Sequence, residues 1–183
     1  MMDVNKRIEF FRNFLNPAMP MESIERIETG LKDLDFFNKP ASISHHGMNT
    51  GDLFEHSLDV ARNLVDLTKR LELKWDRSSS PYIVGLLHDL CKCDNYIHPP
   101  ADTDPEHWEY NNATILTGHG EKSVIMALKI LPLTDEEIAC IRWHMGAFDD
   151  KGNWNNYGHA VTVYPNVLFT HTADMIAARI HGI

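Results

Sequence analysis

The segment 86–92, LLHDLCK, places a histidine and a carboxylate side by side among three leucines. Burying a carboxylate in such an apolar segment is costly unless a positive group compensates its charge. Histidine is the commonest protein ligand for metal ions. The doublet His88-Asp89 therefore raises the possibility of a buried metal site in which a bound cation neutralises Asp89.

Four more residues able to bind a metal lie within or beside apolar helical segments: His56, His119, His144 and Asp174. The separations are 32 residues from His56 to His88, 30 from Asp89 to His119, 25 from His119 to His144 and 30 from His144 to Asp174. Each position therefore falls on a separate element. Separate helices of one bundle can direct such side chains to a common centre. Two buried aspartates among four histidines need a shared positive partner, which one or two divalent ions would supply.

Helical periodicity covers most of the chain and predicts an all-α fold. Apolar residues recur at helical spacing in 3–15, 21–37, 50–73, 120–131, 133–145 and about 159–181. A further helix is expected to start near Pro81, which is typical of a first turn, and to run through the doublet. Thr134 with Glu137 three residues later forms a capping-box pattern at the start of the 133–145 helix.

Two segments interrupt the helical pattern. Prolines break the stretch 94–117, in which we expect a small β-hairpin around 106–117 with Asn111-Asn112 at its turn. Residues 149–158 are expected to form a polar loop. Because each segment follows a predicted metal ligand, both are expected to open near the metals and to contribute to substrate choice.

Composition limits the classes of function. The chain has 183 residues, 43% of them hydrophobic, which is ordinary for one globular unit. No apolar run reaches the roughly 20 residues of a membrane helix, and the charged N-terminal stretch is not typical of an export signal. The three cysteines then indicate reduced thiols and a cytoplasmic location. A net charge of −9 argues against long duplex nucleic acid as a partner but leaves a small phosphorylated substrate open.

The order His56, His88-Asp89, Asp174 resembles that of the HD-domain superfamily of metal-dependent phosphohydrolases. LLHDLCK is similar to the superfamily's HD-x-x-K form, and HHGMNTGDLFEHSLDVA resembles its first motif. GHGEKSVIMAL and IACIRWHM resemble the intervening histidine motifs of members with two metals. The resemblance spans about 45–180 and implies an HD-domain helical bundle at 45–183. We expect the helices of 1–44 to pack on it within a single globular unit, while a dimer contact by this segment remains open.

The resemblance also implies roles for the metal ligands. The first ion would be held by His56, His88, Asp89 and Asp174. Asp89 would bridge to a second ion that is also held by His119 and His144. This mixed nitrogen and oxygen ligand set suits Fe, Mn, Zn, Co or Ni better than Mg or Ca.

Catalytic and substrate roles follow from the same resemblance. Asp89 and Lys92 would be the catalytic residues, with Lys92 near the phosphate, and bound metal would activate water. His45, His46 and His171 are candidate substrate residues. The expected reaction is hydrolysis of a nucleotide or other small phosphoester. No GYP motif is present, so the cyclic-dinucleotide branch is not implied.

Several alternatives remain open on sequence grounds. His119 and His144 could cap helix ends, Lys92 could be a surface lysine, and His171 could simply pack. HD-fold proteins with the same six ligands include mixed-valent di-iron oxygenases, so ligand identity alone does not decide between oxygenase and hydrolase. A third alternative is a binding module that keeps the metal for stability. The oligomeric state is open.

Overall fold

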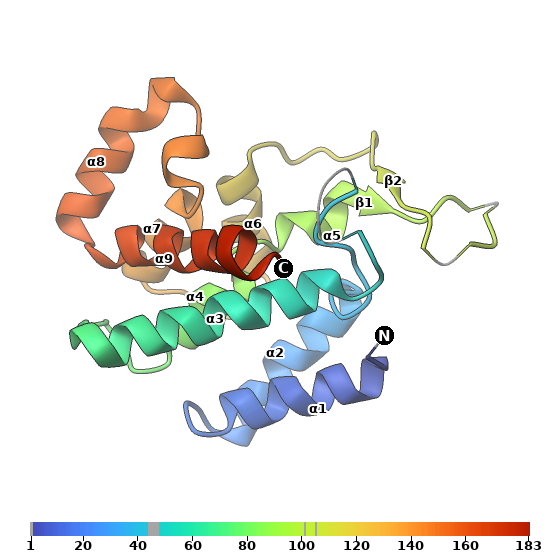
Figure 1. The fold of residues 1–183 in the computed structure, drawn as a ribbon, viewed down its shortest axis with the longest axis horizontal. Coiled ribbons are helices and arrows are strands. Elements are labelled where there is room, and N and C mark those ends of the chain that lie inside the picture. Colours follow the sequence, from blue (N-terminus) through green and yellow to red (C-terminus); the bar gives the residue numbers. More distant parts are fainter. Residues whose placement is uncertain (1, 44–47, 101, 105) are drawn as a thin grey trace.

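The computed structural model describes residues 2–43, 48–100, 102–104 and 106–183, and helices make up most of them (Figure 1). The α-helices are α1 (Val4–Leu15), α2 (Met21–Asp33), α3 (Asp52–Leu71), α4 (Ser80–Leu87), α5 (Cys91–Asn95), α6 (His119–Leu128), α7 (Asp135–Trp143), α8 (Trp154–Val163) and α9 (Asn166–Met175). Two 3₁₀ turns and a π-helix complete the set: η1 (Gly146–Phe148), η2 (Lys151–Asn153) and η3 (Ile176–His181). The predicted all-α class is confirmed. Within the described ranges, no helix is both long enough and apolar enough to cross a bilayer.

A small antiparallel sheet corrects the predicted hairpin. Strand β2 (Glu109–Tyr110) lies in the expected stretch, but it pairs with β1 (Tyr96–Ile97), which directly follows α5. The predicted turn at Asn111-Asn112 is wrong. Asn111 instead directly follows β2, where its main-chain N–H donates to the carbonyl of Asn95 and its side-chain amide donates to the carbonyl of Asp94. The loop between the two strands projects from the body of the molecule (Figure 1).

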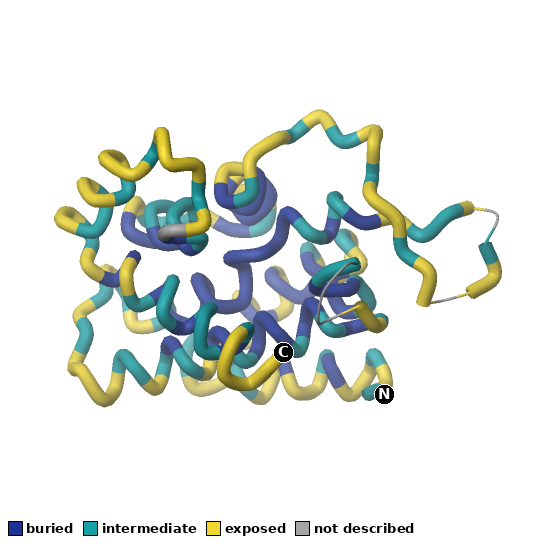
Figure 2. The backbone as a smooth tube through the Cα atoms, turned by 45° about the horizontal axis from the view of Figure 1, so that its top comes forward, coloured by how far each residue is buried: buried dark blue, intermediate teal, exposed yellow. Residues whose placement is uncertain are grey.

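Aromatic packing joins the N-terminal helices to α3. Phe11 of α1 meets Phe37 edge to face with ring centroids 5.6 Å apart, and Phe37 lies 5.5 Å from Phe54 of α3. Buried Arg7 adds hydrogen bonds of 3.0 and 2.8 Å to the carbonyls of Phe37 and Thr50. Buried chain occupies the middle of the molecule, with exposed chain around it (Figure 2). The division of the chain near residue 44 stays a prediction.

The C-terminal third differs from the single helix expected over 159–181. Helix α8 already begins at Trp154, inside the expected polar loop, and ends before Tyr164. Pro165 explains the break, because proline disfavours the helical conformation at the preceding residue, and Tyr164 has φ −125° and ψ 86°. The chain then continues through α9 into the π-helix η3. The helix expected to start near Pro81 is α4, which stops at Leu87, so His88-Asp89 lie at its end, in the turn before α5.

The backbones of α3 and α4 are in unusually close contact at Gly85. A Cβ atom built on Gly85 would lie 2.3 Å from the Cα atom of Ala61. Only glycine allows this approach, since real Cβ atoms do not come within 3.0 Å of backbone. Because Gly85 precedes His88 by three residues and Ala61 follows His56 by five, the contact also sets how close these two histidines come.

Gly85→Ala should therefore destabilise the protein by about 1–3 kcal/mol, the usual range for overpacking a core. Gly158→Ala is the matched control, because no atom lies within 4 Å of its Cβ position in α8. There alanine should stabilise, by up to about 1 kcal/mol, through helix propensity. Urea unfolding of both variants tests this, and equal effects of the two substitutions would contradict the close-contact interpretation.

Candidate metal centre

Side chains from five segments of the chain converge on one buried centre. His56 projects from the middle of α3 and Asp174 from α9, while the doublet His88-Asp89 comes from the turn after α4. His119 is the first residue of α6, and His144 immediately follows α7. The structure thus brings together all six residues predicted as metal ligands, and their role as ligands stays a prediction.

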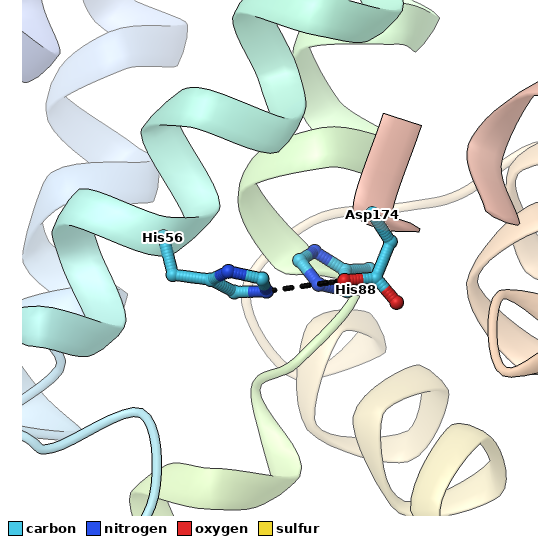
Figure 3. Close-up of side chains that lie close together, drawn as sticks. All are labelled: His56, His88 and Asp174. Atoms are coloured by element: carbon cyan, nitrogen blue, oxygen red, sulfur yellow. Dashed lines mark ion pairs between the residues drawn. The ribbon is translucent and has the colours of Figure 1, made fainter. Parts of the chain in front are cut away.

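One half of the centre contains His56, His88 and Asp174 (Figure 3). The Nε2 atom of His56 lies 3.3 Å from Oδ1 of Asp174, and that of His88 lies 3.9 Å from the same oxygen. The two Nε2 atoms are also 3.6 and 3.5 Å from Oδ2 of Asp89. One potential ligand atom from each of His56, His88 and Asp174 therefore lies close enough to the others for a shared ion.

The other half faces the second oxygen of Asp89. Oδ1 of Asp89 lies 2.6 Å from Nε2 of His119 and 3.4 Å from Nε2 of His144. The two oxygens of one carboxylate therefore point to two different histidine pairs. This division is the geometry that a bridging carboxylate requires.

Three histidines present unused nitrogen atoms to the centre. The Nε2 atoms of His56, His88 and His144 are buried and lack a hydrogen-bond partner among the described residues. Each ring is oriented through Nδ1: His88 and His144 donate to the carbonyl three residues earlier, at 2.8 and 2.7 Å, and His56 donates to Ile183 at 3.0 Å. A carbonyl can only accept, so Nδ1 carries a proton in each ring and Nε2 is the nitrogen left facing the centre. This is the arrangement of metal-binding histidines, and these side chains could hold a metal ion.

Charge at the centre is concentrated around Asp89. Burial alone raises the pKa of this carboxyl, but Lys92, His88 and His119 outweigh burial and hold the pKa well below its usual range. Burial also opposes ionisation of Asp174, yet the neighbouring rings of His56 and His88 outweigh burial and bring its pKa to about 2. Both aspartates are therefore carboxylates at neutral pH.

The histidines respond differently to the same surroundings. Burial lowers the pKa of His119 less than Asp89 raises it, and the balance brings that pKa to about 10. For His144 burial dominates and lowers the pKa, which favours the neutral ring that a metal ligand needs.

Lys92 completes the surroundings of Asp89. Its Nζ atom lies 2.6 Å from Oδ2 of Asp89, one helical turn along the chain. Burial disfavours its charge, but the ion pair with Asp89 raises the pKa of Lys92. A surface position for Lys92 is thereby excluded, because its side chain is only 17% exposed.

A second close helix contact sets the spacing of His119 and His144. A Cβ atom on Gly120 would lie 2.0 Å from the carbonyl oxygen of Arg142. The first turn of α6 therefore presses directly against the last turn of α7. His119 and His144 flank this contact, and their ring centroids are 5.2 Å apart.

A cavity of about 390 Å³ opens onto the centre. Its lining includes His56, Asp89, Lys92, His119 and Asp174, and the remaining wall is formed by Ala41, Ser42, Tyr96, Met145, Phe148, Met175, Ala178, Arg179 and Ile183. Of the two segments expected to shape substrate choice, 94–117 contributes Tyr96 to the cavity wall. His119, which also lines the cavity, lies just beyond the end of this segment. The segment 149–158 contributes no residue among those described.

Arg179 is a functional candidate that the sequence did not identify. It follows Asp174 by five residues, a spacing that leaves the shared face of an α-helix. The π-helix η3 has the wider i to i+5 repeat, which explains how Arg179 reaches the same cavity as Asp174. Neither Phe148 nor Met145 could be assigned to the cavity from sequence, because Met145 lies in the turn after α7 and Phe148 in the short 3₁₀ turn η1.

The three predicted substrate histidines have different outcomes. His45 and His46 lie outside the described residues. His171 packs behind the centre, where its Nδ1 atom lies 2.7 Å from the carbonyl oxygen of His144 and its ring borders Gly146. It is not among the described residues that line the cavity. A substrate role for His171 stays a prediction, whereas its contact with the His144 turn is a structural role.

Comparison with protein-family models, with curated proteins and with solved structures finds no match for this chain.

Adding a divalent transition metal to metal-free protein should raise its melting temperature. At a free concentration 100 times the dissociation constant, binding stabilises by about 2.7 kcal/mol, or about 5–10 °C for a domain of this size. Asp174→Asn should reduce the increase, and His159→Ala, at an exposed position on α8, should keep it. An equal rise in wild-type and Asp174→Asn protein would place the bound metal elsewhere.

Proposed function

We propose that the protein is a metal-dependent phosphohydrolase of the HD-domain type, acting on a nucleotide or another small phosphoester. The observation that carries the proposal is the shared position of Asp89. Its two oxygens face two histidine pairs, and a lysine contacts the same carboxylate at the edge of a cavity. In this proposal the first ion is held by His56, His88, Asp89 and Asp174, and the second by Asp89, His119 and His144.

The bound metal would lower the pKa of water and polarise phosphate oxygens. The chain supplies the remaining functions. The carbonyl contacts of His56, His88 and His144 orient their rings before any ligand arrives, so little reorganisation is needed on binding. Lys92, held beside Asp89, contributes a positive charge at the edge of the cavity where phosphate oxygens would gather.

The cavity wall favours an anionic ligand with an apolar part. Lys92 and Arg179 provide two cations, while Met145, Phe148 and Met175 provide an apolar surface. The volume of about 390 Å³ lies within the range of small-molecule sites. A phosphate beside the cations and a base against the apolar wall would use both surfaces, which is why a nucleotide is the preferred substrate class.

The alternative, a mixed-valent di-iron oxygenase, uses the same six ligands. The two cations of the cavity favour a phosphoester over an uncharged diol, so hydrolysis is the leading proposal. Iron as the native metal, together with oxygen consumption, would favour the oxygenase instead.

The direct test is release of phosphate or nucleotide from a panel of phosphomonoesters and phosphodiesters by protein loaded with Mn²⁺ or Co²⁺. Asp89→Ala should abolish turnover, because it removes a ligand shared by both halves of the centre. His159→Ala should retain full activity, since this side chain is exposed on α8. Metal-loaded wild-type protein that turned over no member of the panel would contradict the proposal.

Lys92→Met should lower kcat by about 10²–10³, the usual effect of removing one group that stabilises charge in the transition state. The loss should appear with metal binding retained, because Lys92 is not a ligand in this proposal. Lys69→Met, at an exposed position of α3, is the control. Steady-state kinetics on metal-loaded variants checks this, and an unchanged kcat would assign Lys92 to structure alone.

A further inference from the structure

His119 is held differently from the other three histidines of the centre. Its side chain is 33% exposed, while those of His56, His88 and His144 are at most 5% exposed. The other three rings are oriented by backbone carbonyls. The Nδ1 atom of His119 instead lies 3.5 Å from the sulfur of Cys91.

Cys91 is rigidly placed for this contact. It is fully buried, and its main-chain N–H donates to the hydroxyl of Ser123 at 3.1 Å. The same hydroxyl donates to the carbonyl of His119, also at 3.1 Å. The start of α5 and the start of α6 are thus joined by the Ser123 hydroxyl as well as by the thiol contact.

The orientation of the His119 ring distinguishes two roles for the sulfur of Cys91, as a metal ligand or as a hydrogen-bond acceptor. Nε2 points to Oδ1 of Asp89 at 2.6 Å, and Nδ1 points to Cys91. The two nitrogens of an imidazole ring point in different directions, so an ion bound at Nε2 lies on the Asp89 side. The sulfur is then placed to accept a hydrogen bond from Nδ1–H, as the carbonyls do for the other histidines.

We infer that Cys91 is a positioning residue for His119 and thereby sets the affinity of the second metal position. The inference rests on the proposed metal centre and deepens it. Thiol sulfur is only a weak hydrogen-bond acceptor, so the ring of His119 is held less firmly than its three counterparts. The ion at the His119 and His144 half should accordingly be the weaker bound of the two.

Calorimetric titration of metal-free protein with Co²⁺ tests the inference without relying on activity. Wild-type protein should bind two ions in two phases. Cys91→Ala should weaken the second phase by about 10-fold or more, as loss of a partner behind a metal-binding histidine does, and leave the first phase unchanged. Cys91→Ser should restore the second phase, because its hydroxyl can accept the hydrogen bond. Cys93→Ala is the matched control, a buried cysteine two residues away.

Thermal melting checks that each variant folds. If Cys91→Ala unfolds the protein, Cys91→Val replaces it, because valine fills the space without accepting a hydrogen bond. An unchanged second phase in the alanine or valine variant would overturn the inference while leaving the metal centre intact. A sulfur-to-cobalt charge-transfer band in wild-type protein would overturn it too, by making Cys91 a ligand. Absence of any bound ion in wild-type protein would overturn the metal centre itself, and the inference with it.

Discussion

The buried carboxylate of Asp89 is the constraint on which the rest of the structure depends. An isolated charge at this depth would cost several kcal/mol, yet the carboxylate contacts four histidines and Lys92. These groups come from α3, the turn after α4, α5, the start of α6 and the end of α7 (Figure 1). Compensating one charge therefore requires most of the bundle to be assembled. The same side chains could hold a metal ion, because the nitrogens that face Asp89 include three without a hydrogen-bond partner among the described residues.

Close backbone contacts give the centre its dimensions. At Gly85 and Gly120 the absence of a side chain lets neighbouring helices approach to distances that a Cβ atom would prevent. One contact lies beside His88 and the other beside His119, so each supports a different half of the centre. Carbonyl contacts then fix ring orientation at His88 and His144. Helix spacing and ring orientation are thus set by main-chain atoms, which makes the ligand arrangement largely independent of surface residues.

Sequence alone predicted the helical class and the six converging residues, because apolar periodicity and ligand-capable side chains are local features. It failed where the outcome depends on tertiary contacts. The pairing of β2 with β1 joins two strands that are separated along the chain. The apolar pattern continues on both sides of Pro165, so the sequence predicted one helix where the structure has a break. Arg179 was missed because a π-helix changes the residues that share a face. For Cys91 the sequence indicates only a reduced thiol, and the fold is needed to place its sulfur beside Nδ1 of His119.

The metal centre is tested most directly by the metal content per chain, element by element, of protein purified without added metal or chelator. We expect close to two equivalents of transition metal, falling to one in a His119→Ala/His144→Ala variant. Iron would then turn attention to oxygenase chemistry, whereas Mn, Zn, Co or Ni would favour hydrolysis. One equivalent that the double variant retains would contradict the bridging role of Asp89. Protein without metal that also takes none up from solution would contradict the metal centre altogether.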